Sequence, residues 1–130
     1  MIIERPSHDA GGHRGTKEVL VIRIINSSLS DNVVKIEDSL RGASDYPKVL
    51  ILRLHRVTAI DESGLMGLKR VVEGHKNRGG TVILCAIHHQ PLQMLRNFGI
   101  IDLIGVKNIC STFYDSMIRA NESLKELNLR

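Results

Sequence analysis

Three short, almost wholly apolar segments, each followed by a helix-like pattern, constrain the fold of this chain more than any other feature. They run over residues 19–25, 49–54 and 81–86 and are rich in Val, Ile and Leu. An uninterrupted apolar run is typical of a strand that is covered on both faces, as in a parallel sheet. The pattern predicts an α/β fold with a single small, mostly parallel sheet of about four to five strands and about four helices.

The segments between and after these strands carry the apolar spacing of amphipathic helices. The third of these helices is expected to bury Leu92, Leu95 and Phe98 and to end at Gly99. A short fourth strand is expected around residues 106–109. The expected helix starts are at Ser30 or Asp31, at Asp61, near Pro91, and at Ser111 or Thr112.

Length and composition fit one domain. The chain has 130 residues, of which 42% are apolar, and its formal net charge is +4. Residues 1–17 are expected to form a flexible lead-in and residues 18–130 the folded domain. The mild charge permits an anionic partner, but the scarcity of aromatic residues argues against nucleic acid. No segment approaches the roughly 18 apolar residues that a membrane span needs, so the chain by itself is expected to be soluble.

The most informative stretch for function follows the second strand and opens a helix: Ile60-Asp61-Glu62-Ser63-Gly64-Leu65. Asp61 fits as the helix cap, Glu62 complements the helix dipole, and Gly64 allows close approach of another group. In the simplest interpretation these residues only cap a helix. Ser63 lacks the flanking glycines of a nucleophile elbow and no histidine is nominated as its base, so an enzyme is not expected.

No metal site or phosphate-binding loop is expected either. The histidines and the two cysteines do not have the spacing of zinc ligands, and the histidines are expected to be solvated or to cap helices. Cys85 lies in an apolar run and is expected to be a buried thiol. Gly79-Gly80 closes a helix instead of opening one, so it does not match a phosphate loop.

A buried strand, then Asp61-Glu62-Ser63-Gly64-Leu65 opening a helix, then Gly79-Gly80 before a third strand, resembles the layout of STAS domains over about residues 19–120. That family includes anti-sigma-factor antagonists and the cytoplasmic tails of SulP-type anion transporters. In the antagonist branch the Ser directly after the Asp is phosphorylated, and that position is Glu62 here. Ser63 matches the next Ser, which is not the usual phosphoacceptor.

The SulP branch resembles this chain more closely. The matching positions are Gln90-Pro91-Leu92, Leu95, Gly99, Ile104-Gly105 and Asn108-Ile109. The resemblance implies a non-catalytic domain on the cytoplasmic face of the inner (plasma) membrane, part of a transporter for sulfate or another anion. A free-standing antagonist-like regulator that lacks the usual phosphoacceptor is the alternative.

The resemblance also implies partners and a site. The partner would be the transmembrane domain of the parent transporter, and another STAS copy or a regulatory protein could also bind. The implied regulatory loop comprises Thr58, Asp61, Glu62, Ser63 and Gly64. No cofactor is expected, although some STAS domains bind guanine nucleotides, and Glu62 works against a phosphate at this loop.

A basic helix face is a further expectation. Lys69, Arg70, Lys76 and Arg78 are predicted to lie on one face of the helix that follows the loop. The simplest interpretation is a solvated charged face, but below a bilayer such a face would lie near anionic head groups.

Overall fold

A computed structural model describes residues 1–4, 18–42 and 46–129 of the chain. In these residues a single sheet has five strands in the order β1-β2-β3-β4-β5. β1 pairs antiparallel with β2, and the other neighbouring strands are parallel. The strands are β1 (Ile2–Glu4), β2 (Val19–Arg23), β3 (Val49–Arg53), β4 (Thr81–Cys85) and β5 (Ile109–Cys110). The predicted α/β class with a mostly parallel sheet is therefore confirmed.

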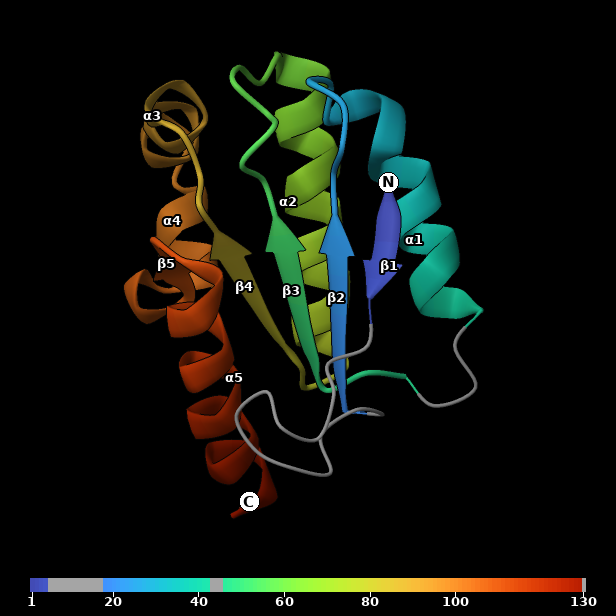
Figure 1. Cartoon of the computed structure of the whole chain (residues 1–130), viewed down its shortest axis with the longest axis vertical. Helices are drawn as coiled ribbons and strands as arrows, with labels where there is room; N and C mark the ends of the chain where they lie inside the picture. The colour runs from blue at the N-terminus through green and yellow to red at the C-terminus, as the bar shows by residue number, and fades with distance from the viewer. Residues whose placement is uncertain (5–17, 43–45, 130) are drawn as a thin grey trace.

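Helices cover both faces of the sheet (Figure 1). α5 lies alone on one face, whereas α1 to α4 pack on the other. The helices are α1 (Val33–Arg41), α2 (Glu62–Asn77), α3 (His89–Asn97), α4 (Ile100–Ile104) and α5 (Phe113–Asn128), with 3-10 turns η1 (Ser30–Asn32) and η2 (Val106–Asn108). Each connection between parallel strands runs from the carboxyl end of one strand back to the amino end of the next, so the loops that follow β2, β3 and β4 lie together at the carboxyl edge of the sheet.

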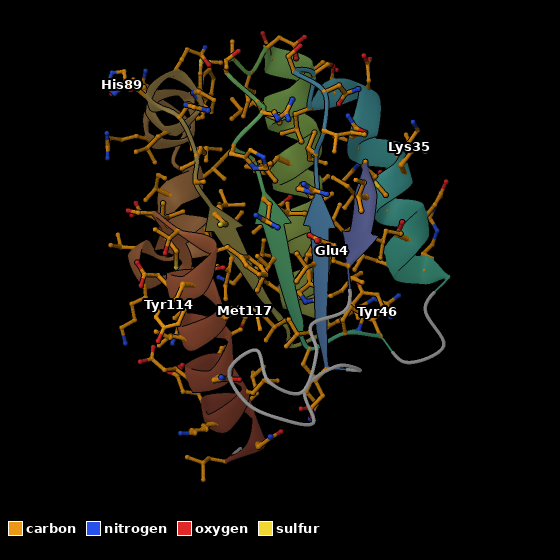
Figure 2. The ribbon with its side chains drawn as sticks, in the orientation of Figure 1. Glu4, Lys35, Tyr46, His89, Tyr114 and Met117 are labelled. Carbon is orange, nitrogen blue, oxygen red and sulfur yellow. The ribbon has the colours of Figure 1, made fainter. Side chains whose placement is uncertain are left out.

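The alternation of side chains along the strands divides the core into two layers. Leu20, Ile22 and Leu50 point to the layer under α1, α2, α3 and α4. Val21 and Ile51 point to the layer under α5, where they meet Met117, Ala120 and Leu124. Figure 2 shows Met117 on the sheet side of α5 and Tyr114 on its outer side. Burial on both faces explains why these strands read as continuous apolar runs.

Two expectations at the chain's ends and edges are wrong. Ile2–Glu4 is not part of a flexible lead-in but forms the edge strand β1, with Ile3 opposite Ile22. The rest of that lead-in, residues 5–17, lies outside the described residues. The fourth predicted strand is shortened: residues 106–108 form a 3-10 turn, and only Ile109 and Cys110 pair with β4.

Other differences concern burial and capping. Phe98 is 55% exposed, because it follows the last turn of α3 and no longer continues the helical spacing that buries Leu95. His75 is fully buried instead of solvated. Neither Ser30 nor Asp31 caps α1 through its side chain; a 3-10 turn leads into the helix instead. The predicted end at Gly99 is confirmed by its left-handed backbone, with φ of 75°.

Candidate functional site

The loop between β3 and α2 ends in a capped helix start. Asp61 Oδ1 accepts a hydrogen bond from the Gly64 amide at 2.7 Å, which confirms the predicted cap. Glu62 and Ser63 occupy the first turn of α2 with their side chains exposed. The structure therefore presents a carboxylate and a hydroxyl to solvent at the helix start. Thr58 is exposed earlier in the same loop.

Gly64 allows the close approach that the sequence suggested. A Cβ atom at Gly64 would lie 3.4 Å from the Ser30 amide and 3.2 Å from Asp61 Oδ1. One turn later, a Cβ atom at Gly67 would lie 2.6 Å from Val33 Cγ2, which is closer than side chains tolerate. The first half of α2 is thus seated directly against η1 and α1.

The segment after β2 is fixed by a buried amide that sequence reasoning missed. Asn32 is fully buried, and its Nδ2 donates to Asn26 Oδ1 at 2.6 Å and to Ser28 O at 2.7 Å. Ser28 Oγ lies 3.1 Å from Ser30 Oγ. These bonds fix the turn before α1, which lines the same hollow as the loop that carries Asp61. No sequence pattern singles out this Asn among the polar residues of the turn.

A second residue missed as part of the site is Gln90, at the start of α3. Gln90 Oε1 accepts from the Ile60 amide at 2.8 Å, and Gln90 Nε2 donates to Ile60 O at 3.3 Å. The amide of Gln90 therefore satisfies both backbone groups of the residue before Asp61. The Gln90-Pro91 pair was the available signal, although it indicated a family resemblance and not a contact.

The loops after β2 and β3 enclose an open hollow of about 360 Å³. Asp61 supplies the only charged side chain of its lining, and several hydroxyl groups supply the rest of its polarity. The lining residues are Ser27, Ser28, Leu29, Ser30, Thr58, Ala59, Ile60 and Asp61. The hollow therefore suits hydrogen-bonding groups of a partner better than a phosphate, because it offers no cation.

The site lacks the arrangement that nucleophilic catalysis requires. In the part of the chain that the structure describes, no hydrogen bond joins Ser63 to a histidine. Burial raises the pKa of the Cys85 thiol, and burial followed by the Cys85 charge raises that of Cys110, so neither is a ready thiolate. Across residues 1–4, 18–42 and 46–129, no group of three or more His, Cys, Asp or Glu side chains could hold a metal ion.

The predicted basic face is wrong, because the four residues point to different neighbours. Arg70 forms an ion pair with Glu37 of α1, with Nε 3.1 Å from Oε2. Lys76 Nζ donates to Leu103 O of α4, on the other side of α2, at 2.6 Å. Arg78 follows the helix and stacks over the Tyr46 ring, 4.1 Å from its centroid. Lys69 is the fourth, and it is half-buried.

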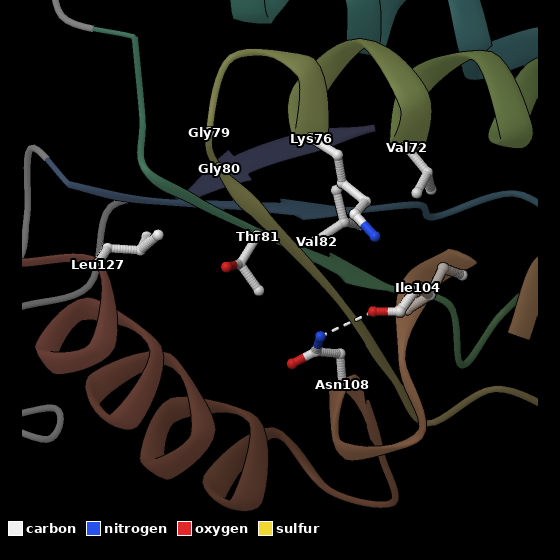
Figure 3. Close-up of a pocket in the computed structure, with 9 residues that line it drawn as sticks. All are labelled: Val72, Lys76, Gly79, Gly80, Thr81, Val82, Ile104, Asn108 and Leu127. Atoms are coloured by element: carbon white, nitrogen blue, oxygen red, sulfur yellow. Dashed lines mark hydrogen bonds between the residues drawn. The ribbon is translucent and has the colours of Figure 1, made fainter. Parts of the chain in front are cut away.

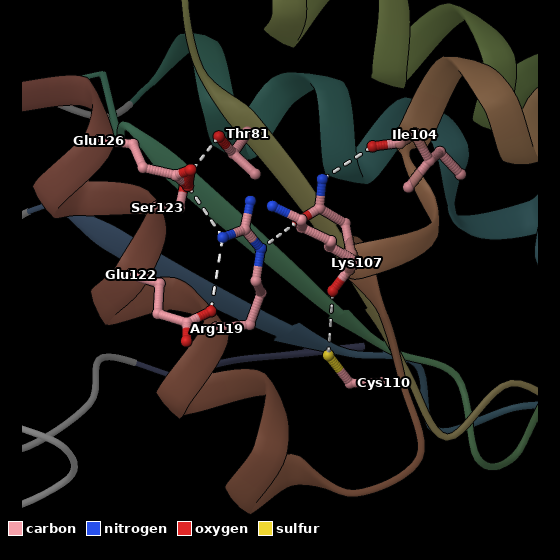
Figure 4. A network of polar contacts seen from close by, with 9 residues as sticks. Thr81, Ile104, Lys107, Cys110, Arg119, Glu122, Ser123 and Glu126 are labelled. Carbon is pink, nitrogen blue, oxygen red and sulfur yellow. Dashed lines mark hydrogen bonds and ion pairs between the residues drawn. The ribbon is translucent and has the colours of Figure 1, made fainter.

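A second polar region lies away from the loop, at the amino end of β4. Lys76, Thr81 and Asn108 line a pocket of about 190 Å³ between α2, α4 and α5 (Figure 3). Beside it, Arg119 of α5 donates to Asn108 Oδ1 at 2.7 Å and pairs with Glu126 at 2.9 Å (Figure 4). The bond to Asn108 joins α5 to η2, the pair with Glu126 lies within α5, and these groups are satisfied within the protein.

Comparisons with known proteins agree with this architecture. The sequence model of the STAS domain matches residues 13–116, so the chain belongs to the STAS domain family. The matched range covers the loop between β3 and α2 and the first turn of α5, and starts earlier than the expected boundary at residue 18. Comparison with curated proteins returned no match.

Several solved structures share the fold. A sulfate transporter family protein from Wolinella succinogenes has a TM-score of 0.75 at 23% identity, covering 83% of this chain and 88% of that chain. The SulP transporter STAS domain from Vibrio cholerae has a TM-score of 0.72 at 22% identity, covering 92% and 91%. A proposed anti-sigma factor antagonist from Thermotoga maritima has a TM-score of 0.57 at 14% identity, covering 85% and 88%.

Among the described residues, no helix combines the length and hydropathy needed to cross a membrane.

Proposed function

We propose that this chain is the non-catalytic cytoplasmic STAS domain of a SulP-type sulfate or anion transporter. In this role it serves assembly or regulation through its contact with the transmembrane domain. The contact surface is the loop of Thr58, Asp61, Glu62, Ser63 and Gly64 with the adjacent hollow. Another STAS copy or a regulatory protein could bind the same surface.

One observation carries the proposal: the loop is held rigidly while its polar groups face outward. Gln90 fixes the Ile60 peptide group, and Asp61 fixes the Gly64 amide. Glu62 and Ser63 remain exposed at the helix start. A preorganised, exposed loop suits docking, because little conformational entropy is lost when a partner binds.

The likeness to two transporter-associated STAS structures supports the transporter over the antagonist. Both have higher TM-scores and higher identities than the antagonist structure. Glu62 at the position of the phosphoacceptor also counts against a phosphorylation cycle, since a carboxylate cannot accept and release a phosphate. Guanine nucleotide binding gains no support, because the hollow has an acidic residue and no cation.

Localisation and size of the native polypeptide test the proposal. Cells of the source organism would be fractionated and probed with an antibody raised against this chain. The transporter assignment predicts an antigen in the membrane fraction, on a polypeptide much larger than 14.5 kDa. A soluble antigen of about the chain's own mass, bound to a kinase-like protein, would instead support the antagonist alternative.

A further inference from the structure

Two arginines lie side by side at the carboxyl edge of the sheet, on the face covered by α5. Arg23 ends β2, Arg53 ends β3, and the two are register partners. They follow Val21 and Ile51 by two residues, and these point into the α5 layer. Neighbouring strands are spaced by about 4.8 Å, so both guanidinium groups start from adjacent positions on one face.

Both arginines carry a donor that the protein does not satisfy. The Nε atoms of Arg23 and Arg53 are buried and have no hydrogen-bond partner among the described residues. Arg53 is otherwise placed by Glu4, whose Oε1 is 3.3 Å from its Nη1, and by the Phe113 ring, 4.3 Å from its Cζ. A buried donor without an acceptor is costly, and such atoms in a native protein call for an explanation.

Positive charge is concentrated around the same edge. The pKa of His55, two residues after Arg53, is lowered, first by burial and then by the charges of Arg53, Arg56 and Arg23. His88 Nε2 lies 2.6 Å from the carbonyl oxygen of His55, so a second imidazole adjoins the cluster. Of the two paired arginines, Arg53 has an ion pair with the carboxylate of Glu4.

We propose that Arg23 and Arg53 bind a phosphate-class oxyanion such as phosphate, sulfate or a phosphate monoester. A tetrahedral oxyanion has enough oxygens to accept from two guanidinium groups at once, whereas Glu4 already supplies a carboxylate to Arg53. Neither Arg23 nor Arg53 lines the hollow beside the loop that carries Asp61, so the two sites are distinct. It does not depend on the transporter assignment.

Nuclear magnetic resonance of the arginine side chains tests the site directly. Sodium phosphate or sodium sulfate is titrated against the labelled chain, with sodium chloride at matched ionic strength as the reference. The Nε–Hε signals of Arg23 and Arg53 are expected to shift saturably with phosphate and sulfate and not with chloride. Arg23→Gln should weaken phosphate binding about tenfold, as expected for loss of a charge-assisted hydrogen bond.

Two further variants make the test specific. Glu4→Gln should tighten phosphate binding about two- to fivefold, because it frees Arg53 from a partly exposed ion pair. Arg96→Gln removes one positive charge from an exposed position in α3 and should leave the affinity within about twofold. Arg53→Gln would also remove the contact with Phe113 and could unfold the chain. If it does, the result with Arg23→Gln decides the test.

Vesicles of phosphatidylcholine with and without phosphatidic acid distinguish the sources of the oxyanion. Binding that requires phosphatidic acid and is lost in Arg23→Gln assigns the site to a lipid head group, whereas saturation by free phosphate alone assigns it to a soluble anion. The proposal is overturned if phosphate acts no differently from chloride. It is also overturned if Arg96→Gln weakens binding as much as Arg23→Gln.

Discussion

The side-chain amide of Gln90 forms two hydrogen bonds with the backbone of Ile60. It accepts from the Ile60 N–H at 2.8 Å and donates to the Ile60 carbonyl oxygen at 3.3 Å. This pair of bonds joins the start of α3 to the residue before the α2 cap, 30 positions away in the chain. The loop between β3 and α2 therefore takes its position from α3 as well as from its own helix.

Replacing this amide should loosen the loop. Gln90→Ala is expected to lower the free energy of unfolding by about 1 kcal/mol and to speed hydrogen exchange at the Ile60 amide. Gln93→Ala is the matched control, because the side chain of Gln93 donates its hydrogen bond to Asn97 within α3 and not to the loop. Chemical denaturation and exchange measurements check the result. Equal exchange rates at the Ile60 amide in both variants would contradict a stabilising role for the two Gln90 hydrogen bonds.

The cap at Asp61 should stabilise α2. Asp61→Ala removes the acceptor of the Gly64 amide and is expected to cost about 0.5–2 kcal/mol in thermal or chemical unfolding. Asp61→Asn keeps an oxygen acceptor and should lose less. If Asp61→Ala is as stable as the parent chain, the residue is kept for a partner instead of for the helix.

The identity of residue 62 should decide whether the loop can be phosphorylated. Incubation with an antagonist-type serine kinase and ATP is expected to add no phosphate to the parent chain, as judged by intact mass. Glu62→Ser supplies a hydroxyl at the exposed first position of α2 and should add one phosphate; Glu62→Gln is the control. Stoichiometric phosphate on Ser63 of the parent chain is the contrary result.

His75 should make the fold sensitive to acid. Burial lowers its pKa, with a smaller lowering by Arg78, while the hydrogen bond to Lys48 O at 3.3 Å acts in the opposite direction. The folded pKa therefore lies below the unfolded value of about 6.5. The contribution of His75 to the free energy of unfolding is therefore fully present above the pKa of the unfolded chain. It is lost as the pH falls toward the pKa of the folded chain, because the unfolded chain binds the proton more readily.

We expect His75→Gln to flatten the dependence of unfolding free energy on pH between about 7 and 5. The slope of unfolding free energy against pH should decrease without vanishing, because His55 contributes to it in the same direction. The pKa of His55 is also lowered, first by burial and then by Arg53. His89→Gln, at an exposed position of α3, is the control. Unfolding free energies would be measured across this pH range for the parent chain, His75→Gln and His89→Gln. The same dependence on pH in all three would refute the role of His75.

Local patterns predicted most of the fold. The strands β2, β3 and β4 are buried on both faces, so their apolar runs are unambiguous, and the caps at Asp61 and Thr112 follow from side-chain chemistry. β1 was missed because Ile2–Glu4 is short and only its long-range pairing with β2 makes it a strand. The burial of His75 agrees with its helical spacing from Leu65, Leu68 and Val72, whereas its hydrogen bond to Lys48 O depends on where the backbone before β3 lies.

The candidate site was predictable only in part. The loop residues follow from the strand-to-helix pattern, but the hydrogen bonds from Gln90 and Asn32 depend on how separate loops meet. The adjacency of Arg23 and Arg53 depends on strand register, which the sequence alone does not define. The basic face failed because Arg70 and Lys76 lie on opposite sides of α2.

Photocrosslinking from the regulatory loop in intact cells tests the central claim most directly. A photoreactive amino acid at position 62 would be compared with one at Arg96, which is also exposed. We expect crosslinks from position 62, and few from position 96, to peptides of a polytopic SulP-type transporter, identified by mass spectrometry. Crosslinks from position 62 to a soluble kinase-like protein, with none to a transporter, would contradict the account.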